Sequence, residues 1–251
     1  MKNKLEIKND ASKHKGAWIY MKIKEKLFLT QEELAIYGSI NIVIFGDSIS
    51  QGCLVRHIDY DSVYWNRLRK KLNAIRDFVP VNMICSAISG ITATESVPRL
   101  EKQVLCHEPD AVIVCFGLND VNGPLEAYLR SLRIIFKRCT KAGAEVIFMT
   151  PNMMNTYVAD DTPAKYLEYA HKSAEMQNNG KMDLYISEAI KLATEMGITV
   201  CDCYSKWKEL AKTQDVTMLL ANRINHPNEE MHSIFAESLY EILIGPENKS
   251  L

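Results

Sequence analysis

Five short, almost continuously apolar runs alternate along the chain with longer segments in which apolar residues recur every three or four positions. Strands that are buried on both faces are continuously apolar, whereas a helix with one buried face shows the longer spacing. Strand alternating with helix predicts an α/β fold: a three-layer α/β/α sandwich around a five-stranded parallel sheet. The apolar runs occupy residues 41–45, 79–85, 111–116, 144–150 and 198–202.

The segments with helical spacing have suitable residues at their ends. Thr92 and Glu95 are spaced as a capping box, Pro124 suits a first helical turn, and Gly143 and Gly197 stand where C-caps belong. The spacing predicts helices over 62–78, 92–106, 125–142, 183–196 and 229–243.

The first 40 residues fit this alternation less well. The run 17–23 predicts an edge strand, and the segment 29–38 predicts a short helix. We interpret residues 1–40 as an N-terminal extension that packs against the domain, with a lid over a functional site as the alternative. Residues 41–245 are expected to form a single globular domain.

Composition and charge exclude several classes of function. A net charge of −1 provides no basic surface for a nucleic acid, and no stretch approaches the roughly 18 apolar residues of a membrane span. The seven cysteines are odd in number and lie mostly in apolar runs, which predicts reduced structural thiols. Cys201 and Cys203 lack the second pair that a metal or redox site would need. We expect a cytoplasmic protein with no nucleic-acid or membrane partner, no cofactor and no metal.

Residues capable of catalysis follow the predicted strands. Ser48 lies in FGDSISQG after the first strand, Gly90 in AISG after the second, and Asn119 in GLND after the third. Because parallel strands end at one edge of a sheet, these residues should meet there. His226, in INHP, can reach that edge if the chain folds back after the fifth strand. Each residue alone is ordinary turn chemistry, but the four together favour a serine hydrolase.

These motifs resemble those of the SGNH hydrolases, and the resemblance implies a role for each residue that agrees with the chemistry of acyl transfer. Ser48 would be the nucleophile and His226 the general base, while the N–H groups of Ser48 and Gly90 and the side-chain amide of Asn119 would hold the oxyanion. Asp47, beside the nucleophile, is placed among the supporting residues. The same turn lacks the lysine and the glycine spacing of a phosphate-binding loop.

From about residue 40 to 243 the chain resembles the SGNH hydrolases, or GDSL esterase/lipase family, through the motifs at 45–52, 87–90, 117–120 and 224–227. The resemblance implies a flavodoxin-like SGNH hydrolase fold and a serine esterase that hydrolyses short-chain acyl esters, chiefly acetyl esters of a carbohydrate or small metabolite. An acyltransferase or an inactive ligand-binding relative is the alternative. A homo-oligomer is compatible with the sequence.

One position departs from the family pattern, which places an aspartate three residues before the histidine. Arg223 stands there, and a guanidinium cannot accept the histidine N–H. We therefore expect a Ser–His dyad, with His226 oriented by a backbone carbonyl from residues 220–224, by Asn222 as the second choice, or by a distant carboxylate. The loop 151–162, which carries Met153 and Met154, either walls the pocket or packs into the core.

Overall fold

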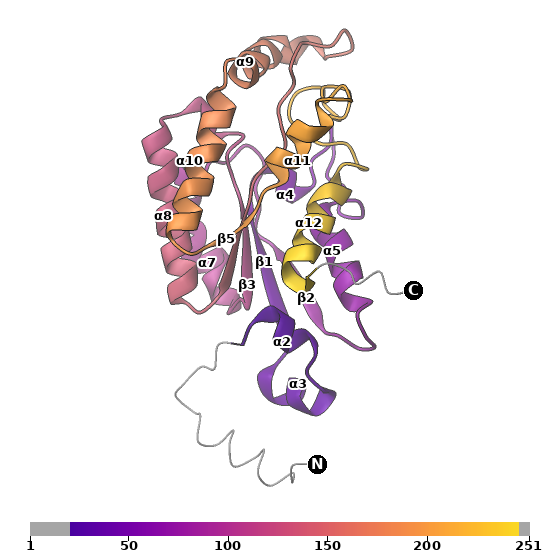
Figure 1. Cartoon of the computed structure of the whole chain (residues 1–251), viewed down its shortest axis with the longest axis vertical. Coiled ribbons are helices and arrows are strands. Elements are labelled where there is room, and N and C mark those ends of the chain that lie inside the picture. The colour runs from indigo at the N-terminus through magenta and orange to yellow at the C-terminus, as the bar shows by residue number, and fades with distance from the viewer. Residues whose placement is uncertain (1–20, 246–251) are drawn as a thin grey trace.

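All five strands in the described part of the chain, residues 21–245 of the computed structural model, run parallel in one sheet (Figure 1). Their order is β2-β1-β3-β4-β5, which is the flavodoxin-like arrangement. The predicted five-stranded parallel sheet is confirmed. The strands are β1 (Ile40–Gly46), β2 (Val81–Cys85), β3 (Ala111–Cys115), β4 (Glu145–Met149) and β5 (Thr199–Cys201).

The burial of the strands explains their sequence pattern. Strand β3 lies in the middle of the sheet, between β1 and β4, and all of its residues are buried. A strand with helices on both faces has no solvent side, so it needs an apolar residue at every position. The edge strands β2 and β5 are partly exposed, which accounts for Asn82 and Thr199 within them.

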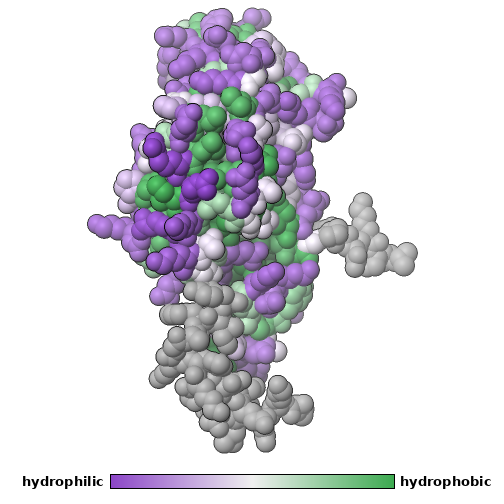
Figure 2. All heavy atoms as spheres, turned by 60° about the vertical axis from the view of Figure 1, so that its left-hand side comes forward, coloured by the Kyte–Doolittle hydropathy of each residue, from purple (hydrophilic) through white to green (hydrophobic). Residues whose placement is uncertain are grey.

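Two helical layers cover the sheet, which confirms the predicted α/β/α sandwich (Figure 1). Figure 2 shows that hydrophilic residues cover much of the outer surface on the side of the first layer, with smaller hydrophobic areas between them. That layer contains α6 (Ala93–Ser96), α7 (Leu100–Gln103), α8 (Leu125–Lys141) and α10 (Lys181–Glu195), and the opposite layer contains α5 (Tyr64–Asn73), α11 (Cys203–Leu210) and α12 (His232–Ile244).

The predicted helix over 92–106 is interrupted. Thr92 does form the expected capping box with Glu95, but Val97–Arg99 and Leu105–His107 are 3-10 turns that flank α7. Pro98 lacks the N–H that a continuous helix would use, so the chain tightens at this point. Four α-helices of the described residues were not expected: α2 (Ile23–Leu27), α4 (Ser48–Gln51), α9 (Leu167–Asn178) and α11 (Cys203–Leu210).

Two short helices precede the sheet, α2 (Ile23–Leu27) and α3 (Gln31–Tyr37). Helix α3 confirms the short helix expected over 29–38. The edge strand expected over 17–23 lies mostly outside the described residues, and it is wrong at Ile23, which is helical. Both helices lie beyond the amino ends of the strands, opposite the edge at which β1 and β3 lead into Ser48 and Asn119 (Figure 1).

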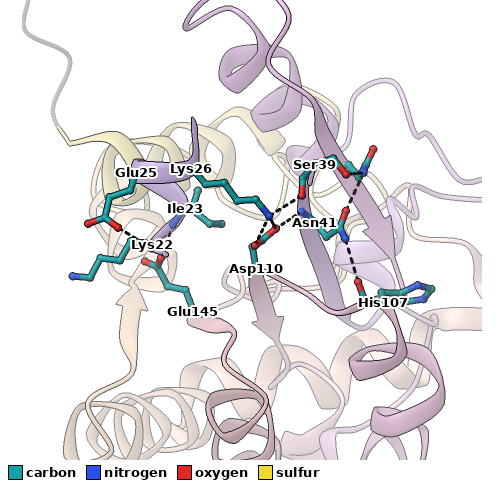
Figure 3. Close-up of polar contacts among 10 residues, drawn as sticks. Lys22, Ile23, Glu25, Lys26, Ser39, Asn41, His107, Asp110 and Glu145 are labelled. Atoms are coloured by element: carbon teal, nitrogen blue, oxygen red, sulfur yellow. Dashed lines mark hydrogen bonds and ion pairs between the residues drawn. The ribbon is translucent and has the colours of Figure 1, made fainter. Parts of the chain in front are cut away.

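A buried ammonium group attaches α2 to the sheet (Figure 3). Lys26 Nζ lies 2.8 Å from Asp110 Oδ1 and 2.8 Å from the carbonyl oxygen of Ser39, and the side chain of Lys26 is only 9% exposed. Asp110 also accepts the N–H of Asn41, at the start of β1. Residues 21–39 are therefore bound at the amino edge of the sheet and do not cover its carboxyl edge. The division of the chain at residue 40 stays a prediction.

We predict that Lys26→Met lowers the free energy of unfolding by about 3 kcal/mol, because it leaves the Asp110 carboxylate in a largely buried site without its partner. Urea unfolding measures the change. Lys212→Met is the matched control, since the ion pair of Lys212 with Glu209 is exposed and its loss should cost no more than about 0.5 kcal/mol. Equal effects of the two substitutions would contradict the role assigned to Lys26.

Candidate active site

Ser48 is the first residue of α4, directly after β1. Asp47 caps this helix, with Oδ1 accepting the N–H of Ile49 at 3.0 Å. Gly46 allows the close approach of β3, because a Cβ there would lie 2.6 Å from the carbonyl oxygen of Cys115. The N–H of Ser48 has no acceptor within residues 21–245. Ser48 thus presents a hydroxyl and an unused backbone donor at a helix N-terminus, where negative charge is favoured.

Gly90 offers a second backbone donor from the loop that follows β2. Its φ of +78° favours glycine, its surroundings are open, and its N–H also finds no acceptor in the described part of the chain. The neighbouring N–H of Ser89 donates to Gln51 Oε1 of α4 at 2.7 Å, and Ile88 N–H donates to the carbonyl of Gly46 at 3.1 Å. These bonds hold the Gly90 loop beside the turn that carries Ser48.

Asn119, after β3, reaches both of these segments. Its Nδ2 donates to the carbonyl oxygen of Ile91 at 3.1 Å and to Asp47 Oδ2 at 3.4 Å. The structure therefore brings Ser48, Gly90 and Asn119 to one edge of the sheet. Both amide hydrogens of Asn119 have acceptors, and the longer contact, with Asp47, is the weaker one. A substrate oxygen that takes this donor would replace Asp47.

Two buried carboxyl groups lie beneath these loops. Burial raises the pKa of Asp47 and of Asp120 to about 7 each. Asp120 Oδ1 accepts the N–H of Ala93 at 2.9 Å, whereas Oδ2 is buried without a partner among the described residues. Asp120 thus fastens the start of α6 beneath the Gly90 loop.

A backbone carbonyl holds the ring of His226. Nδ1 lies 2.6 Å from the carbonyl oxygen of Leu54, and because a carbonyl only accepts, Nδ1 must carry the hydrogen. The lone pair of Nε2 is then free to take a proton. Burial lowers the pKa of His226, which favours the neutral ring, while the hydrogen bond with Leu54 opposes this shift.

The loop 53–58 carries this carbonyl and is hydrogen-bonded to Ser48. Cys53 N–H donates to the carbonyl of Ser48 at 2.9 Å, Leu54 N–H donates to the carbonyl of His57 at 3.0 Å, and Cys53 pairs with Ile58 in an antiparallel bridge. No direct hydrogen bond joins Ser48 to His226 within residues 21–245. One loop therefore bonds to Ser48 through Cys53 and orients His226 through the carbonyl of Leu54.

The expected orienting groups need correction. The carbonyl belongs to Leu54 and not to residues 220–224. These lie in the same turn as His226 and bond only to its backbone: Asn222 Oδ1 accepts the His226 N–H, and Ala221 N–H donates to the His226 carbonyl. Asn222 does not contact the ring: its Oδ1 accepts three N–H groups, from residues 224, 225 and 226, at 2.9–3.0 Å. Arg223 Nε lies 3.0 Å from Asp161. No carboxylate hydrogen-bonds to the His226 ring in the described part of the chain.

Other candidate residues have structural surroundings. Met153 and Met154 of the loop 151–162 are buried in the core, so of the two alternatives for these residues, a pocket wall or core packing, the structure shows core packing. His232 begins α12 and accepts the N–H of Tyr64 through Nδ1, and burial lowers its pKa to about 4. Residues 21–245 contain no group of three or more His, Cys, Asp or Glu that could hold a metal ion. None of the helices described is both long enough and apolar enough to span a membrane.

Comparison with known families matches residues 44–234 to the GDSL-like Lipase/Acylhydrolase family. No curated protein matches the chain.

Similar solved structures include two esterases and a further hydrolase. An acetylxylan esterase from Geobacillus stearothermophilus is 23% identical with a TM-score of 0.65, over 84% of this chain and 96% of the esterase. An acetyl xylan esterase is 20% identical with a TM-score of 0.64, over 82% and 100%. An alpha/beta hydrolase enzyme from the metagenome of Lake Arreo, Spain, is 22% identical with a TM-score of 0.65, over 83% and 95%. At these identities the likeness shows the fold.

The raised pKa of Asp120 gives a pH-dependent stability. Below about pH 4 the carboxyl is protonated in both the folded and the unfolded chain, so its burial carries no ionisation penalty. As pH rises to about 7 the unfolded chain releases the proton first, and the folded state loses relative stability. We predict that the stability of Asp120→Asn relative to the wild type increases between about pH 4 and 7 and is constant above, in urea unfolding.

Asp59→Asn is the control of opposite sign. Hydrogen bonds from Ser62 lower the pKa of Asp59, so this carboxylate adds stability above about pH 4 that is lost on acidification. The relative stability of Asp59→Asn should fall as pH rises. The burial effect assigned to Asp120 is contradicted if both variants shift in the same direction.

Proposed function

The chain belongs to the GDSL-like lipase/acylhydrolase family and is a carboxylic ester hydrolase, and we propose that it cleaves short-chain acyl esters through an acyl-Ser48 intermediate. The substrates we propose are acetyl esters of a carbohydrate or a small metabolite. The matched region contains all four motifs identified in the sequence.

In the proposed first half-reaction, Ser48 Oγ attacks the ester carbonyl carbon while His226 Nε2 takes the hydroxyl proton. The tetrahedral intermediate then collapses, the bond to the alcohol oxygen breaks, and His226 returns the proton to that oxygen. In the second half-reaction water attacks the acyl carbon while His226 takes a proton from the water. The bond between the acyl carbon and Ser48 Oγ then breaks, His226 returns the proton to Oγ, and the carboxylic acid leaves.

The oxyanion formed in each half-reaction needs donors that are already in place. The unused N–H groups of Ser48 and Gly90 are suited to this role, and the start of α4 adds its positive end. Asn119 supplies a third donor when substrate oxygen replaces Asp47 at its amide. Loss of one such donor typically raises the barrier by roughly 2.7–4 kcal/mol.

The observation that carries the proposal is the hydrogen bond between His226 Nδ1 and the Leu54 carbonyl. It selects the one neutral tautomer that can act as a base through Nε2. Arg223 provided the case for an inactive relative, but its guanidinium binds Asp161 and the carbonyls of Met218 and Leu220, so it is occupied away from the ring. The names of the structural neighbours, two of which are acetylxylan esterases, support an acetyl ester as substrate.

Replacement of the nucleophile tests the mechanism. We predict that Ser48→Ala lowers kcat for p-nitrophenyl acetate by at least about 1000-fold, since only the oxyanion donors and substrate binding would remain. A fluorophosphonate probe should label the wild type at Ser48, and His226→Ala should abolish the labelling. Ser233→Ala, which alters an exposed hydroxyl at the start of α12, is the control and should retain both activity and labelling. Unchanged hydrolysis by Ser48→Ala would refute the mechanism.

The lowered pKa of His226 predicts the acid limb of activity. Protonated His226 cannot accept the serine proton, so activity is lost as pH falls through the pKa of the ring. Burial lowers that pKa, and the midpoint of the acid limb in kcat/KM should therefore lie below the ordinary value of 6.5. Asp120→Asn is the control, because it removes a buried carboxyl and leaves His226 in place. A midpoint above 6.5, or one that disappears in Asp120→Asn, would contradict the assignment.

A further inference from the structure

The segment that follows β4 builds a wall above the carboxyl edge of the sheet, near the top of Figure 1. Its helix α9 is held by buried bonds: Asn155 Nδ2 donates to the carbonyl of Ala170 at 2.9 Å, and Met154 N–H donates to Gln177 Oε1 at 2.9 Å. These bonds attach α9 to the segment that follows β4. Tyr169 lies on the first turn of α9 and is half-buried.

The hydroxyl of Tyr169 lies between the two loops that carry His226 and Asn119. On one side Asn225, which directly precedes His226, donates its Nδ2 to the Tyr169 oxygen at 3.4 Å. On the other side Asn122 Nδ2 donates to the carbonyl of Asn119 at 3.2 Å, and the Asn122 side chain opposes the larger effect of burial on the pKa of Tyr169. No other tyrosine hydroxyl in the described part of the chain hydrogen-bonds to Asn225.

The hydrogen of the Tyr169 hydroxyl is available to donate a hydrogen bond. Asn225 Nδ2 is a donor, so the phenol oxygen serves it as acceptor, and the phenol's own hydrogen has no acceptor within residues 21–245. A half-buried O–H without an acceptor costs free energy until a ligand or water accepts its hydrogen bond. Burial raises the pKa of Tyr169, so this hydrogen is present throughout the working pH range.

The proposed reaction determines which part of a substrate would meet this donor. The ester carbonyl oxygen must face the N–H groups of Ser48 and Gly90, and the alcohol oxygen must face His226, which protonates it on departure. Tyr169 is bonded to the residue next to His226, so it stands on the side of the leaving alcohol.

We propose that Tyr169 determines specificity for the alcohol part of the ester, through a hydrogen bond from its hydroxyl to an oxygen of an oxygen-rich alcohol such as a sugar. This inference rests on the proposed esterase function and narrows its substrate class. A simple aryl or alkyl alcohol offers no further oxygen to accept the bond, whereas a carbohydrate offers a hydroxyl or ring oxygen. Among esters with the same acyl group, the Tyr169 hydroxyl therefore favours those whose alcohol is a carbohydrate over those whose alcohol has no further oxygen.

Tyr169→Phe tests the proposal with two acetyl esters, a monoacetylated glucose and phenyl acetate, both followed by acid release in a pH-stat. We expect kcat/KM for the sugar ester to fall about 5- to 10-fold, as for the loss of one hydrogen bond, while kcat/KM for phenyl acetate changes less than about 2-fold. Tyr157→Phe is the matched control. Tyr157 belongs to the same segment, but its hydroxyl already donates to Asp215, so the ratio of the two kcat/KM values should not change.

A purely structural role of Tyr169 would give a different result. If its hydroxyl only braced the Asn225 and Asn122 side chains, Tyr169→Phe would displace His226 and lower kcat for both esters alike. Equal losses, or no loss with either ester, would overturn the proposal. Ser48→Ala is measured in parallel, and hydrolysis that survives this substitution contradicts the proposed mechanism. The proposal for Tyr169 is judged separately, from the ratio of kcat/KM for the two esters in Tyr169→Phe relative to the wild type, whichever residue is the nucleophile.

Discussion

The parallel direction of the five strands is the constraint on which the rest of the molecule depends. Because β1, β2 and β3 all end at one edge, Ser48, Gly90 and Asn119 meet there although the chain separates them widely. At the opposite, amino edge of the sheet, the ion pair between Lys26 and Asp110 binds α2. The ion pair that binds α2 and the residues proposed to face a substrate thus lie at opposite ends of one sheet.

His226 does not follow a strand end directly, so the sheet alone does not place it. Its position depends on two turns: Asn222 caps one by accepting three N–H groups, and the loop 53–58 presents the Leu54 carbonyl to the ring. The second loop begins only a few residues after Ser48 and is bonded to its carbonyl. Ser48 and the carbonyl that orients the His226 ring are therefore parts of one local structure.

The strands and the residues that follow them could be predicted because burial on both faces demands an unbroken apolar run, as in β3. The group that orients His226 could not be predicted, because Leu54 acts through its backbone and its side chain carries no signal of that role. Tyr169 was missed for a related reason: α9 has a weak apolar period, and only the fold brings it between distant asparagines. The prediction of one helix over 92–106 did not take into account that Pro98 has no N–H to donate.

Arg223 in place of an aspartate changes the electrostatics of the base more than its geometry. A carboxylate would hold the same tautomer and would also stabilise the imidazolium by its charge, which raises the pKa of a histidine. The neutral carbonyl of Leu54 orients the ring in the same way but carries only a dipole. Its hydrogen bond raises the pKa of His226 by less than burial lowers it, so the pKa is lowered. The base is then weaker but remains neutral in more acidic solution. In the proposed mechanism more of the barrier reduction would then come from the N–H groups of Ser48 and Gly90, which are free of competing acceptors in the described part of the chain.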